Sequence, residues 1–186
     1  METKRAAILG AALERVAARG IHGTTMAMIA DGAGVGTGTI YRYYRSKDAL
    51  IEALFERVMC AKAAAVLEGY DESQPLEARF RRLWRNMLHY LRDHPRETAL
   101  IEQVESSPLA RPDGMTRYDQ LLQPLMRFYD EMLCEGLIKE MPLAMVSVFF
   151  SDAAISLAKQ HLAGSLVLDE ALEELAISAS WDALCR

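Results

Sequence analysis

The chain has 186 residues, of which 51% are hydrophobic and 25% charged, so it can bury a substantial core and is not intrinsically disordered. Its three cysteines, Cys60, Cys134 and Cys185, are far apart and form no CxxC pair, which argues against a disulfide framework and against zinc. The net charge of −5 is uneven: residues 1–57 carry eight Lys/Arg against six Asp/Glu, a net of +2. Because phosphates respond to the local field, this weakly basic head is compatible with an anionic partner.

No targeting segment is recognisable in the sequence. The start, METKRAAILG, lacks the apolar run of about 7–15 residues that follows the basic start of a signal peptide. The most apolar segment, Leu143 to Ile155, is interrupted by Ser147, Ser151 and Asp152 and is shorter than the roughly 20 apolar residues that a bilayer requires. We therefore expect a cytoplasmic protein with no membrane partner.

Hydrophobic periodicity and the positions of Gly and Pro predict an all-α chain of about nine helices, because no sustained alternating strand pattern is present. The N-terminal helices are expected at residues 3–19, from a Thr24 or Thr25 cap to about residue 30, at 37–44, and from a Ser46 cap onward. After a polar linker at 69–75, further helices are expected at 76–93, 95–106, 115–135, 142–163 and 169–184. Pro124 lies inside the third of these and favours a kink.

These elements predict two domains. We expect residues 2–62 to form an N-terminal three-helix helix-turn-helix domain and residues 63–186 to form a C-terminal helical bundle. The fourth helix belongs physically to both domains. The bundle also contains a basic run, interpreted as a solvated helix face, made of Arg79, Arg81, Arg82 and Arg85.

The segment Gly23–Lys47 carries the functional motif. It predicts two short helices joined by a Gly-containing turn, packed at a steep angle through small and medium apolar residues. Ile40 and Tyr44 stand four residues apart and are expected to hold the third helix in the core. The outer face of that helix then carries Thr37, Gly38, Tyr41 and Arg42.

This outer face suits a DNA groove. Hydroxyl groups can donate to phosphates, and Arg42 can grip guanine or a phosphate with a two-pronged contact. Lys47 begins the fourth helix, where its charge and the helix amides both attract a phosphate. The expected DNA-binding residues are Thr25, Gly36, Thr37, Gly38, Thr39, Tyr41, Arg42, Tyr43 and Lys47. The alternative is a helix-turn-helix that serves only for packing and does not bind DNA. The exposed polar and aromatic residues of this cluster argue against that alternative.

The segment resembles the helix-turn-helix of the TetR family of transcriptional regulators. The usual family pattern is TT, three residues, IA, three residues, GV, then GT-apolar-Y-x-Y/H-F and SK. The positions that correspond to this pattern here are Thr24, Thr25, Ile29, Ala30, Gly34, Val35, Gly38, Thr39, Ile40, Tyr41, Tyr43, Tyr44, Ser46 and Lys47. The resemblance covers residues 2–62, about a third of the chain, and the remainder matches in length and helical layout only.

Four positions depart from the family pattern. Gly36 stands where Ser or Ala is common, Thr37 where Lys is frequent, Arg42 where His is frequent, and Tyr44 where Phe is usual. Loss of a cation at Thr37 removes one groove contact, which Arg42 can replace. These departures bear on the operator sequence and leave the binding mode unchanged.

The resemblance implies a homodimer on double-stranded DNA, because one recognition helix reads too few base pairs and two copies would read a palindrome. It also implies that residues 2–62 bind DNA and that residues 63–186 are a ligand-binding and dimerisation domain, with a cavity for a small-molecule effector that is coupled to DNA affinity through the fourth helix. The implied function is a ligand-responsive repressor released from a palindromic operator by a small apolar effector, with activation left open.

The C-terminal helices supply candidates for both roles. Residues expected at the dimer interface, for which a core within one chain is the less favoured alternative, are Phe149, Phe150, Ala153, Leu157, Leu172, Leu175 and Ala179. Residues expected to line the pocket, each otherwise plain core, are Trp84, Met87, Leu88, Leu91, Ile101, Val104, Leu122, Met126 and Tyr129.

An enzyme is the main rival class. No Walker loop, HExxH or GxSxG motif is present, and no histidine has Glu three residues before it, as helical di-iron sites require. We therefore expect no catalytic residue, no metal and no cofactor. A second rival is a ligand-binding adaptor that has abandoned DNA.

Overall fold

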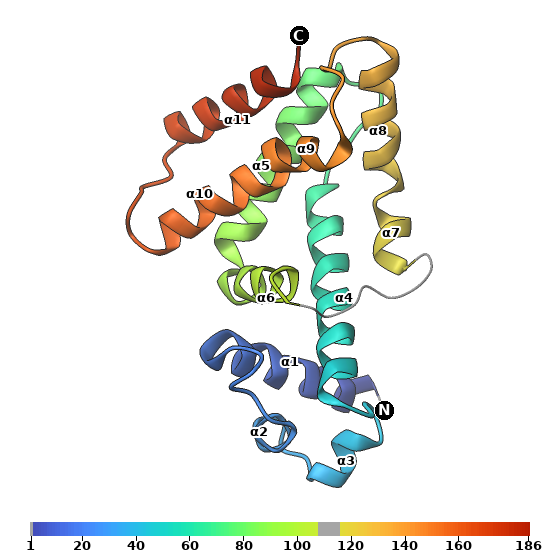
Figure 1. Cartoon of the computed structure of the whole chain (residues 1–186), viewed down its shortest axis with the longest axis vertical. Coiled ribbons are helices and arrows are strands. Elements are labelled where there is room, and N and C mark those ends of the chain that lie inside the picture. Colours follow the sequence, from blue (N-terminus) through green and yellow to red (C-terminus); the bar gives the residue numbers. More distant parts are fainter. Residues whose placement is uncertain (1, 108–115) are drawn as a thin grey trace. The chain divides into compact units, whose positions relative to one another are not determined.

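The computed structural model describes residues 2–107 and 116–186, and within these ranges the chain is helical with no β-strand (Figure 1), which confirms the all-α prediction. In chain order the elements are α1 Glu2–Arg19, α2 Met26–Gly32, α3 Thr37–Tyr41, α4 Lys47–Val66, α5 Leu76–Asp93, α6 Pro95–Glu105, α7 Arg117–Leu121, α8 Gln123–Cys134, α9 Leu143–Ser147, the π-helical turn η1 Val148–Asp152, α10 Ala153–Leu162 and α11 Glu170–Leu184.

One expected helix is divided. Residues 115–135 were predicted as a single helix; residue 115 lies outside the described ranges, and the rest forms α7 and α8 on either side of Leu122. Pro124 lies in the first turn of α8, where its missing N–H removes no helical hydrogen bond. Pro124 therefore lies at the start of a separate helix, α8, and does not kink one continuous helix as we expected.

The described chain divides into two compact units. The N-terminal unit comprises residues 2–60 and 96–107, and the body comprises residues 61–95 and 116–186. α4 therefore begins in the N-terminal unit and ends in the body. α6 belongs by its contacts to the N-terminal unit, although the sequence grouped it with the C-terminal bundle. The functional boundary after residue 62 stays a prediction.

The core of the N-terminal unit forms where α2 packs against α1 and α3. α1 buries one apolar stripe at helical spacing, which includes Ile8, Ala12, Leu13 and Val16. α2 buries Met26, Ile29 and Ala30. Thr25 is the N-cap of α2, because its hydroxyl accepts a hydrogen bond from Met28 N at 3.3 Å.

Two glycines shape the corner between α1 and α2. Gly20 ends α1 with φ of +74°, in the left-handed region that favours glycine. Gly23 is required for a different reason, since a Cβ atom there would lie 2.3 Å from the carbonyl oxygen of Arg19. The corner that leads into the helix-turn-helix therefore depends on a close backbone approach.

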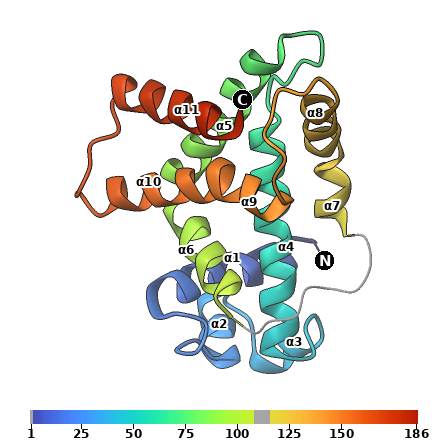
Figure 2. The ribbon, with the colours of Figure 1, turned by 45° about the horizontal axis from the view of Figure 1, so that its top comes forward.

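The body is built around α5, which lies beside α10 and α11 (Figures 1 and 2). α5 is strongly amphipathic, and its apolar face is buried. The ring of Phe80 on this face contacts Phe150 at 5.6 Å and Trp181 at 5.1 Å between ring centroids. Such aromatic contacts add to the stabilisation from burial, and they join α5 to η1 and α11.

The interpretation of the basic run on α5 as a solvated face is wrong at its first residue, Arg79, whereas Arg82 is exposed as expected. The side chain of Arg79 is only 3% exposed, pairs with Glu131 on α8 at 2.7 Å, and donates from Nε to the Tyr70 hydroxyl at 3.1 Å. Its guanidinium also lies over the rings of Tyr70 and Phe128. The sequence shows the four arginines, but it does not show that Glu131, about fifty residues later on α8, pairs with Arg79.

Further along α5, arginine side chains bind α11. Arg85 donates from Nε to Glu173 at 2.8 Å and also pairs with Glu174, and Arg81 lies 3.4 Å from Glu174. His89 Nε2 is 2.8 Å from the other oxygen of Glu173. The polar side of α5 therefore fixes α11 in the body, in addition to the aromatic contacts.

The helical run from α9 through η1 to α10 is long and apolar. Residues Leu143–Leu162 form twenty helical residues that could cross a membrane by length and composition alone, and 17% of the run is buried. The expectation that this segment is too short is therefore wrong, because the helix continues past Ile155. A single such helix is weak evidence for a membrane span, since helices of soluble proteins meet the same criteria.

The three cysteines are free thiols. Burial raises the pKa of the Cys185 thiol, which favours its protonated and unreactive form. Within the described ranges, no group of three or more His, Cys, Asp or Glu side chains could hold a metal ion.

We expect Gly23→Ala to lower the free energy of unfolding by about 1–3 kcal/mol, because the new methyl group would overlap the Arg19 carbonyl. Gly10→Ala is the matched control: Gly10 is inside α1, nothing lies within 4 Å of its Cβ position, and the change should stabilise the protein by about 0.5–1 kcal/mol. Urea unfolding measures both changes. Equal unfolding midpoints for the two variants would contradict the steric argument.

Candidate nucleic-acid interface

α3 is held by two side chains and displays the rest. Ile40 is fully buried and Tyr44 is 5% exposed, as the sequence predicted. The regular helix ends at Tyr41, earlier than the expected residue 44, although Tyr44 N still donates to Ile40 O at 3.0 Å. Tyr41 is 52% exposed and Arg42 is exposed, so the face opposite the two anchors is open to a partner.

The turn before α3 is fixed by backbone hydrogen bonds. Val35 N donates to Ala30 O at 2.9 Å, and Gly34 N donates to Asp31 O at 3.0 Å. Gly34 has φ of +63°, in the left-handed region that glycine adopts without strain. The sharp reversal between α2 and α3 is therefore encoded locally, as a helix-turn-helix requires.

The expected DNA-binding residues lie on one unit, with different exposures. Exposed residues are Thr25, Gly36, Thr37, Gly38, Tyr41 and Arg42, and half-buried residues are Thr39, Tyr43 and Lys47. No Cβ position at Gly36 or Gly38 meets another atom within 4 Å, so both glycines leave open space at the start of α3. Their assignment to DNA stays a prediction.

Lys47 has an internal role that the sequence did not indicate. Its Nζ donates to Ile21 O at 3.0 Å and to Thr24 O at 3.3 Å. Thr24 is itself buried and donates its hydroxyl to Gly20 O at 2.8 Å. The ammonium group therefore joins the start of α4 to the corner between α1 and α2, which limits the donors it has left for a phosphate.

A concave surface of about 470 Å³ lies beside α3. Three short stretches line it: the first turns of α1, the end of α3 with the loop that follows, and the first turns of α4. The lining residues are Arg5, Tyr41, Arg42, Tyr43, Tyr44, Arg45, Ala49 and Ala53. We call this surface the basic cleft, because its described lining residues include three arginines and no carboxylate.

Tyr44 positions one of these arginines. Arg5 Nε donates to the Tyr44 hydroxyl at 3.2 Å, and the guanidinium lies 5.9 Å from the centre of the Tyr44 ring. The hydrogen bond to Tyr44 raises the pKa of Arg5, so the side chain is charged at any physiological pH. The buried ring that anchors α3 thus also orients a cation on α1.

Arg5 and Arg45 were not among the predicted site residues. Arg45 lies within the motif segment, between Tyr44 and Ser46, and it is exposed. Arg5 is 39 residues before Tyr44 in the chain, and only the packing of α1 brings it to the cleft. The net positive charge of residues 1–57 indicated that arginines there could bind an anion. It did not show that Arg5 and Arg45 lie together beside α3.

α6 is tied to the helix-turn-helix corner. Gln103 Oε1 accepts from Ile21 N at 2.9 Å, and Gln103 Nε2 donates to Val16 O at 3.4 Å. Arg96, near the start of α6, pairs with Glu14 on α1 at 3.4 Å. One amide side chain therefore pairs with two backbone groups at the end of α1, and Val16 O also accepts a hydrogen bond from Gly20 N at 2.8 Å.

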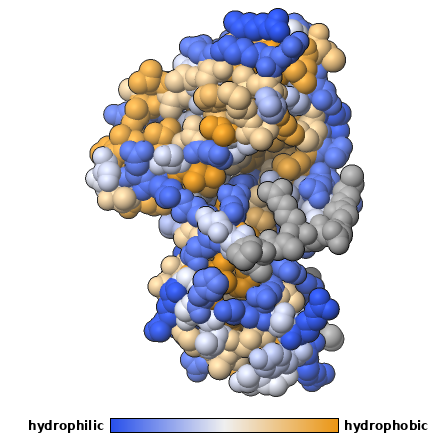
Figure 3. All heavy atoms as spheres, in the orientation of Figure 1, coloured by the Kyte–Doolittle hydropathy of each residue, from blue (hydrophilic) through white to orange (hydrophobic). Residues whose placement is uncertain are grey.

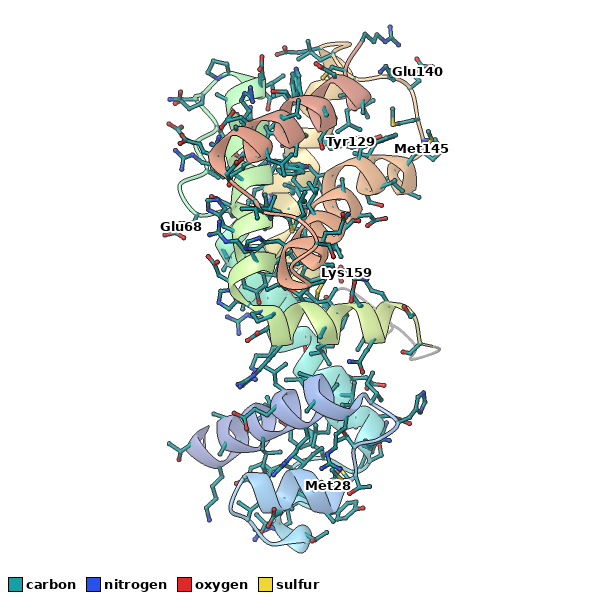
Figure 4. The ribbon with its side chains drawn as sticks, turned by 90° about the vertical axis from the view of Figure 1, so that its left-hand side faces the viewer. Met28, Glu68, Tyr129, Glu140, Met145 and Lys159 are labelled. Atoms are coloured by element: carbon teal, nitrogen blue, oxygen red, sulfur yellow. The ribbon has the colours of Figure 1, made fainter. Side chains whose placement is uncertain are left out.

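The candidate pocket residues are divided between the two units. Ile101 and Val104 lie on α6 in the N-terminal unit, and the other seven lie in the body. Buried residues are Trp84, Met87, Leu88, Leu91 and Ile101, and half-buried residues are Val104, Leu122, Met126 and Tyr129. Trp84 is fully buried, and its Nε1–H has no hydrogen-bond partner among the described residues. Figure 4 labels Tyr129, which lies on α8.

The candidate dimer residues are incompletely covered within one chain. Leu175 is 64% exposed, Ala179 is exposed, and the other five, Phe149, Phe150, Ala153, Leu157 and Leu172, are half-buried. Apolar side chains gather on the surface over α10 and α11 (Figure 3). Met145, on α9, is also about half exposed (Figure 4).

Comparison with known proteins identifies both parts of the chain. The family described as bacterial regulatory proteins, tetR family, matches residues 8–54. A family described as tetracyclin repressor-like, C-terminal domain, matches residues 75–185, which is more than half of the chain. The resemblance seen in the helix-turn-helix is confirmed, and it extends into the body, where the sequence showed only length and layout.

Individual relatives agree with this result. The chain is 26% identical over 179 residues to an HTH-type transcriptional regulator of Haemophilus influenzae, with 93% of this chain and 91% of the relative covered. It is 29% identical over 167 residues to the HTH-type transcriptional regulator RutR of Escherichia coli, with 88% and 75% covered. A crystal structure of a TetR family transcription regulator from Marinobacter aquaeolei superposes with a TM-score of 0.90, at 28% identity, over 99% of this chain and 96% of that one.

We expect Lys47→Met to lower the free energy of unfolding by about 1–3 kcal/mol, because two backbone carbonyls lose a charged donor. Lys4→Met is the control, since Lys4 is exposed in the first turn of α1. The midpoint of urea unfolding measures the difference. If the two variants unfold at the same urea concentration, the internal role of Lys47 is wrong.

Proposed function

We propose that this chain, which belongs to the tetR family of bacterial regulatory proteins, is a homodimeric repressor that a small apolar effector releases from a palindromic operator. That it is a DNA-binding transcriptional regulator follows from the family. The proposal concerns the finer points: the direction of regulation, the dimer, the operator symmetry and the effector. We place this activity in the cytoplasm.

The observation that carries the proposal is the division of α3 into a buried and an open face. Ile40 and Tyr44 anchor the helix, and Thr37, Tyr41 and Arg42 remain exposed on it. An arginine can bind a guanine edge with two parallel hydrogen bonds, and a tyrosine or threonine can bind phosphates. These are the side-chain types that a recognition helix places in the major groove.

The exposed apolar surface of the body supports a dimer. Leu143, Met145, Val148, Leu162 and Leu175 are each at least 45% exposed on the helices α9 to α11. Burial of such surface is worth roughly 25 cal/mol per Å², and monomers rarely leave large apolar patches uncovered. A second copy that presents the same helices would cover this surface through a two-fold axis, and would set two recognition helices about one DNA turn apart.

The interior of the body supports an apolar effector with one polar atom. Trp84 lies on the apolar face of α5 together with Met87, Leu88 and Leu91. A buried donor without a partner costs about 1–3 kcal/mol, and a ligand that presents an acceptor to Trp84 Nε1 would recover that free energy. We therefore propose an effector that is mostly apolar and carries a hydrogen-bond acceptor.

Two helices offer a route from the body to the DNA. The chain passes from the N-terminal unit to the body inside α4, and returns at the start of α6. α4 is fixed to the helix-turn-helix corner by Lys47, and α6 is fixed to the same corner by Gln103. An effector that prefers a different arrangement of either helix would lower DNA affinity by its difference in affinity for the two states.

We expect the double substitution Tyr41→Ala with Arg42→Ala to weaken binding to the duplex upstream of the chain's own gene by about 100-fold, because contacts to base edges are worth about 1–3 kcal/mol each. An electrophoretic mobility shift at low salt measures the loss. Both side chains are exposed, so the thermal stability should not change.

Arg117→Ala is the control for this experiment, because Arg117 is exposed on α7 in the body. It should retain wild-type DNA affinity. A wild-type protein that binds no duplex at low salt would favour the ligand-binding adaptor over the regulator. An equal loss of DNA affinity in Arg117→Ala and in the double variant would contradict the assignment of α3 as the recognition helix.

We expect Leu175→Glu to shift the protein from dimer to monomer, because it would bury a carboxylate in an apolar interface on both sides of the two-fold axis. Sedimentation equilibrium measures the mass. Leu133→Glu is the matched control, since Leu133 is an exposed leucine on α8, outside this surface. A wild-type protein that sediments as a monomer would contradict the dimer.

A further inference from the structure

The basic cleft holds positive charge that nothing in the described chain neutralises. Arg5, Arg42 and Arg45 all line it, and none forms an ion pair with a described carboxylate. Glu56 favours the charge of Arg5 at a distance, without an ion pair. Three like charges around one concave surface repel each other and create a local field that attracts an anion.

One of these cations is already oriented. Tyr44 is buried, and its hydroxyl accepts the Nε–H of Arg5, which fixes the plane of the guanidinium. The two terminal nitrogens of Arg5 have no hydrogen-bond partner among the described residues. A pre-oriented side chain loses less conformational entropy when it binds, so it contributes more affinity than a free surface arginine.

We infer that Arg5 and Arg45 bind a phosphate of the DNA backbone in this cleft, with Tyr44 as the residue that positions Arg5. The inference rests on the proposed function and adds a second contact region to it. The planar guanidinium group matches the geometry of a phosphate with two parallel hydrogen bonds. We call Arg5 and Arg45 the phosphate clamp.

The phosphate clamp lies next to the exposed face of α3, which is the face proposed to enter the major groove. Tyr41 and Arg42 line the basic cleft and also belong to the exposed face of α3. A duplex that receives α3 in its major groove therefore carries its backbone past the cleft. Phosphate contacts fix the register of a protein on DNA and carry no sequence information themselves, so the clamp would orient α3 for base contacts.

The cleft suits a polymer better than a free anion. It is an open surface, and Arg5, Arg42 and Arg45 are all exposed. An isolated anion on such a surface stays largely solvated and is screened by salt. A duplex presents many phosphates at once, so the counterions released at each contact add to the affinity.

The test measures the affinity for a short fluorescent duplex as a function of KCl concentration, for the wild type, Arg5→Gln and Arg45→Gln. Each lost phosphate contact should reduce the slope of log K against log salt by about 0.9, or about 1.8 for a symmetric dimer. The loss should be equal on the upstream duplex and on a random duplex, because phosphates are common to both. Arg19→Gln, an exposed arginine at the opposite end of α1, should retain the wild-type slope.

Tyr44→Phe tests the positioning role. It removes the hydroxyl that holds Arg5 and keeps the buried ring that anchors α3. It should weaken DNA binding in the wild-type background and have no further effect in Arg5→Gln. If Tyr44→Phe weakens binding equally in both backgrounds, its role is structural and the positioning of Arg5 is wrong.

The remaining outcomes separate this inference from the proposed function. A wild-type protein that binds neither duplex at low salt overturns both. A wild-type protein that binds DNA, with salt slopes unchanged in Arg5→Gln and Arg45→Gln, overturns the clamp alone. Displacement of the duplex by inorganic phosphate beyond the effect of KCl at equal ionic strength, in the wild type but not in Arg5→Gln, assigns the cleft to a small anion and also overturns the clamp.

Discussion

The structure of the DNA-binding head depends on the burial of two side chains, Ile40 and Tyr44. α3 has five residues, and a helix of that length is unstable on its own, because nucleation costs more than so few hydrogen bonds return. It persists because Ile40 is fully buried and because Tyr44, just beyond its end, is buried as well. With that side fixed inward, the opposite side must face solvent. The burial of Ile40 and Tyr44 therefore leaves Tyr41 on the solvent-exposed side of α3. The same buried ring of Tyr44 also orients Arg5, so one packing event shapes both α3 and the cleft beside it.

Charge in this protein is organised by location. A net charge of −5 looks unfavourable for a partner of DNA, but the two compact units use their charges differently. In the body, carboxylates of α8 and α11 are engaged by arginines of α5: Glu131 by Arg79, and Glu173 and Glu174 by Arg85. In the N-terminal unit, Lys47 is turned inward to backbone carbonyls, whereas the arginines around the cleft keep their charge exposed. Among the described residues, the exposed positive charge beside α3 therefore comes from a few arginines without an ion pair, and the whole-chain charge describes this local field poorly.

The corner between α1 and α2 is where several long-range contacts meet. Lys47 from α4 and Gln103 from α6 both bind the backbone of Ile21, and Gly23 allows the chain to pass close to Arg19. These contacts are polar, directional and few. Such contacts can be broken and remade at lower cost than a packed apolar core, which tends to have one arrangement. α4, which continues into the body, and α6, which lies in the N-terminal unit, are both joined to this corner by polar contacts of that kind.

The sequence alone determined the helix positions, the helix-turn-helix and its family, and the inward side of α3, because all of these depend on local signals. Periodicity, capping residues and Gly20 act within a few residues, so most helices are found close to where they were expected, whereas the helix predicted at 115–135 is divided at Leu122. Tertiary structure decided what depends on residues far apart in the chain. It paired Arg79 with Glu131, brought Arg5 to Tyr44, turned Lys47 inward and joined α6 to the head through Gln103. A list of charges cannot specify these pairs, since the partner of each cation is selected by how the helices pack and not by its neighbours in sequence.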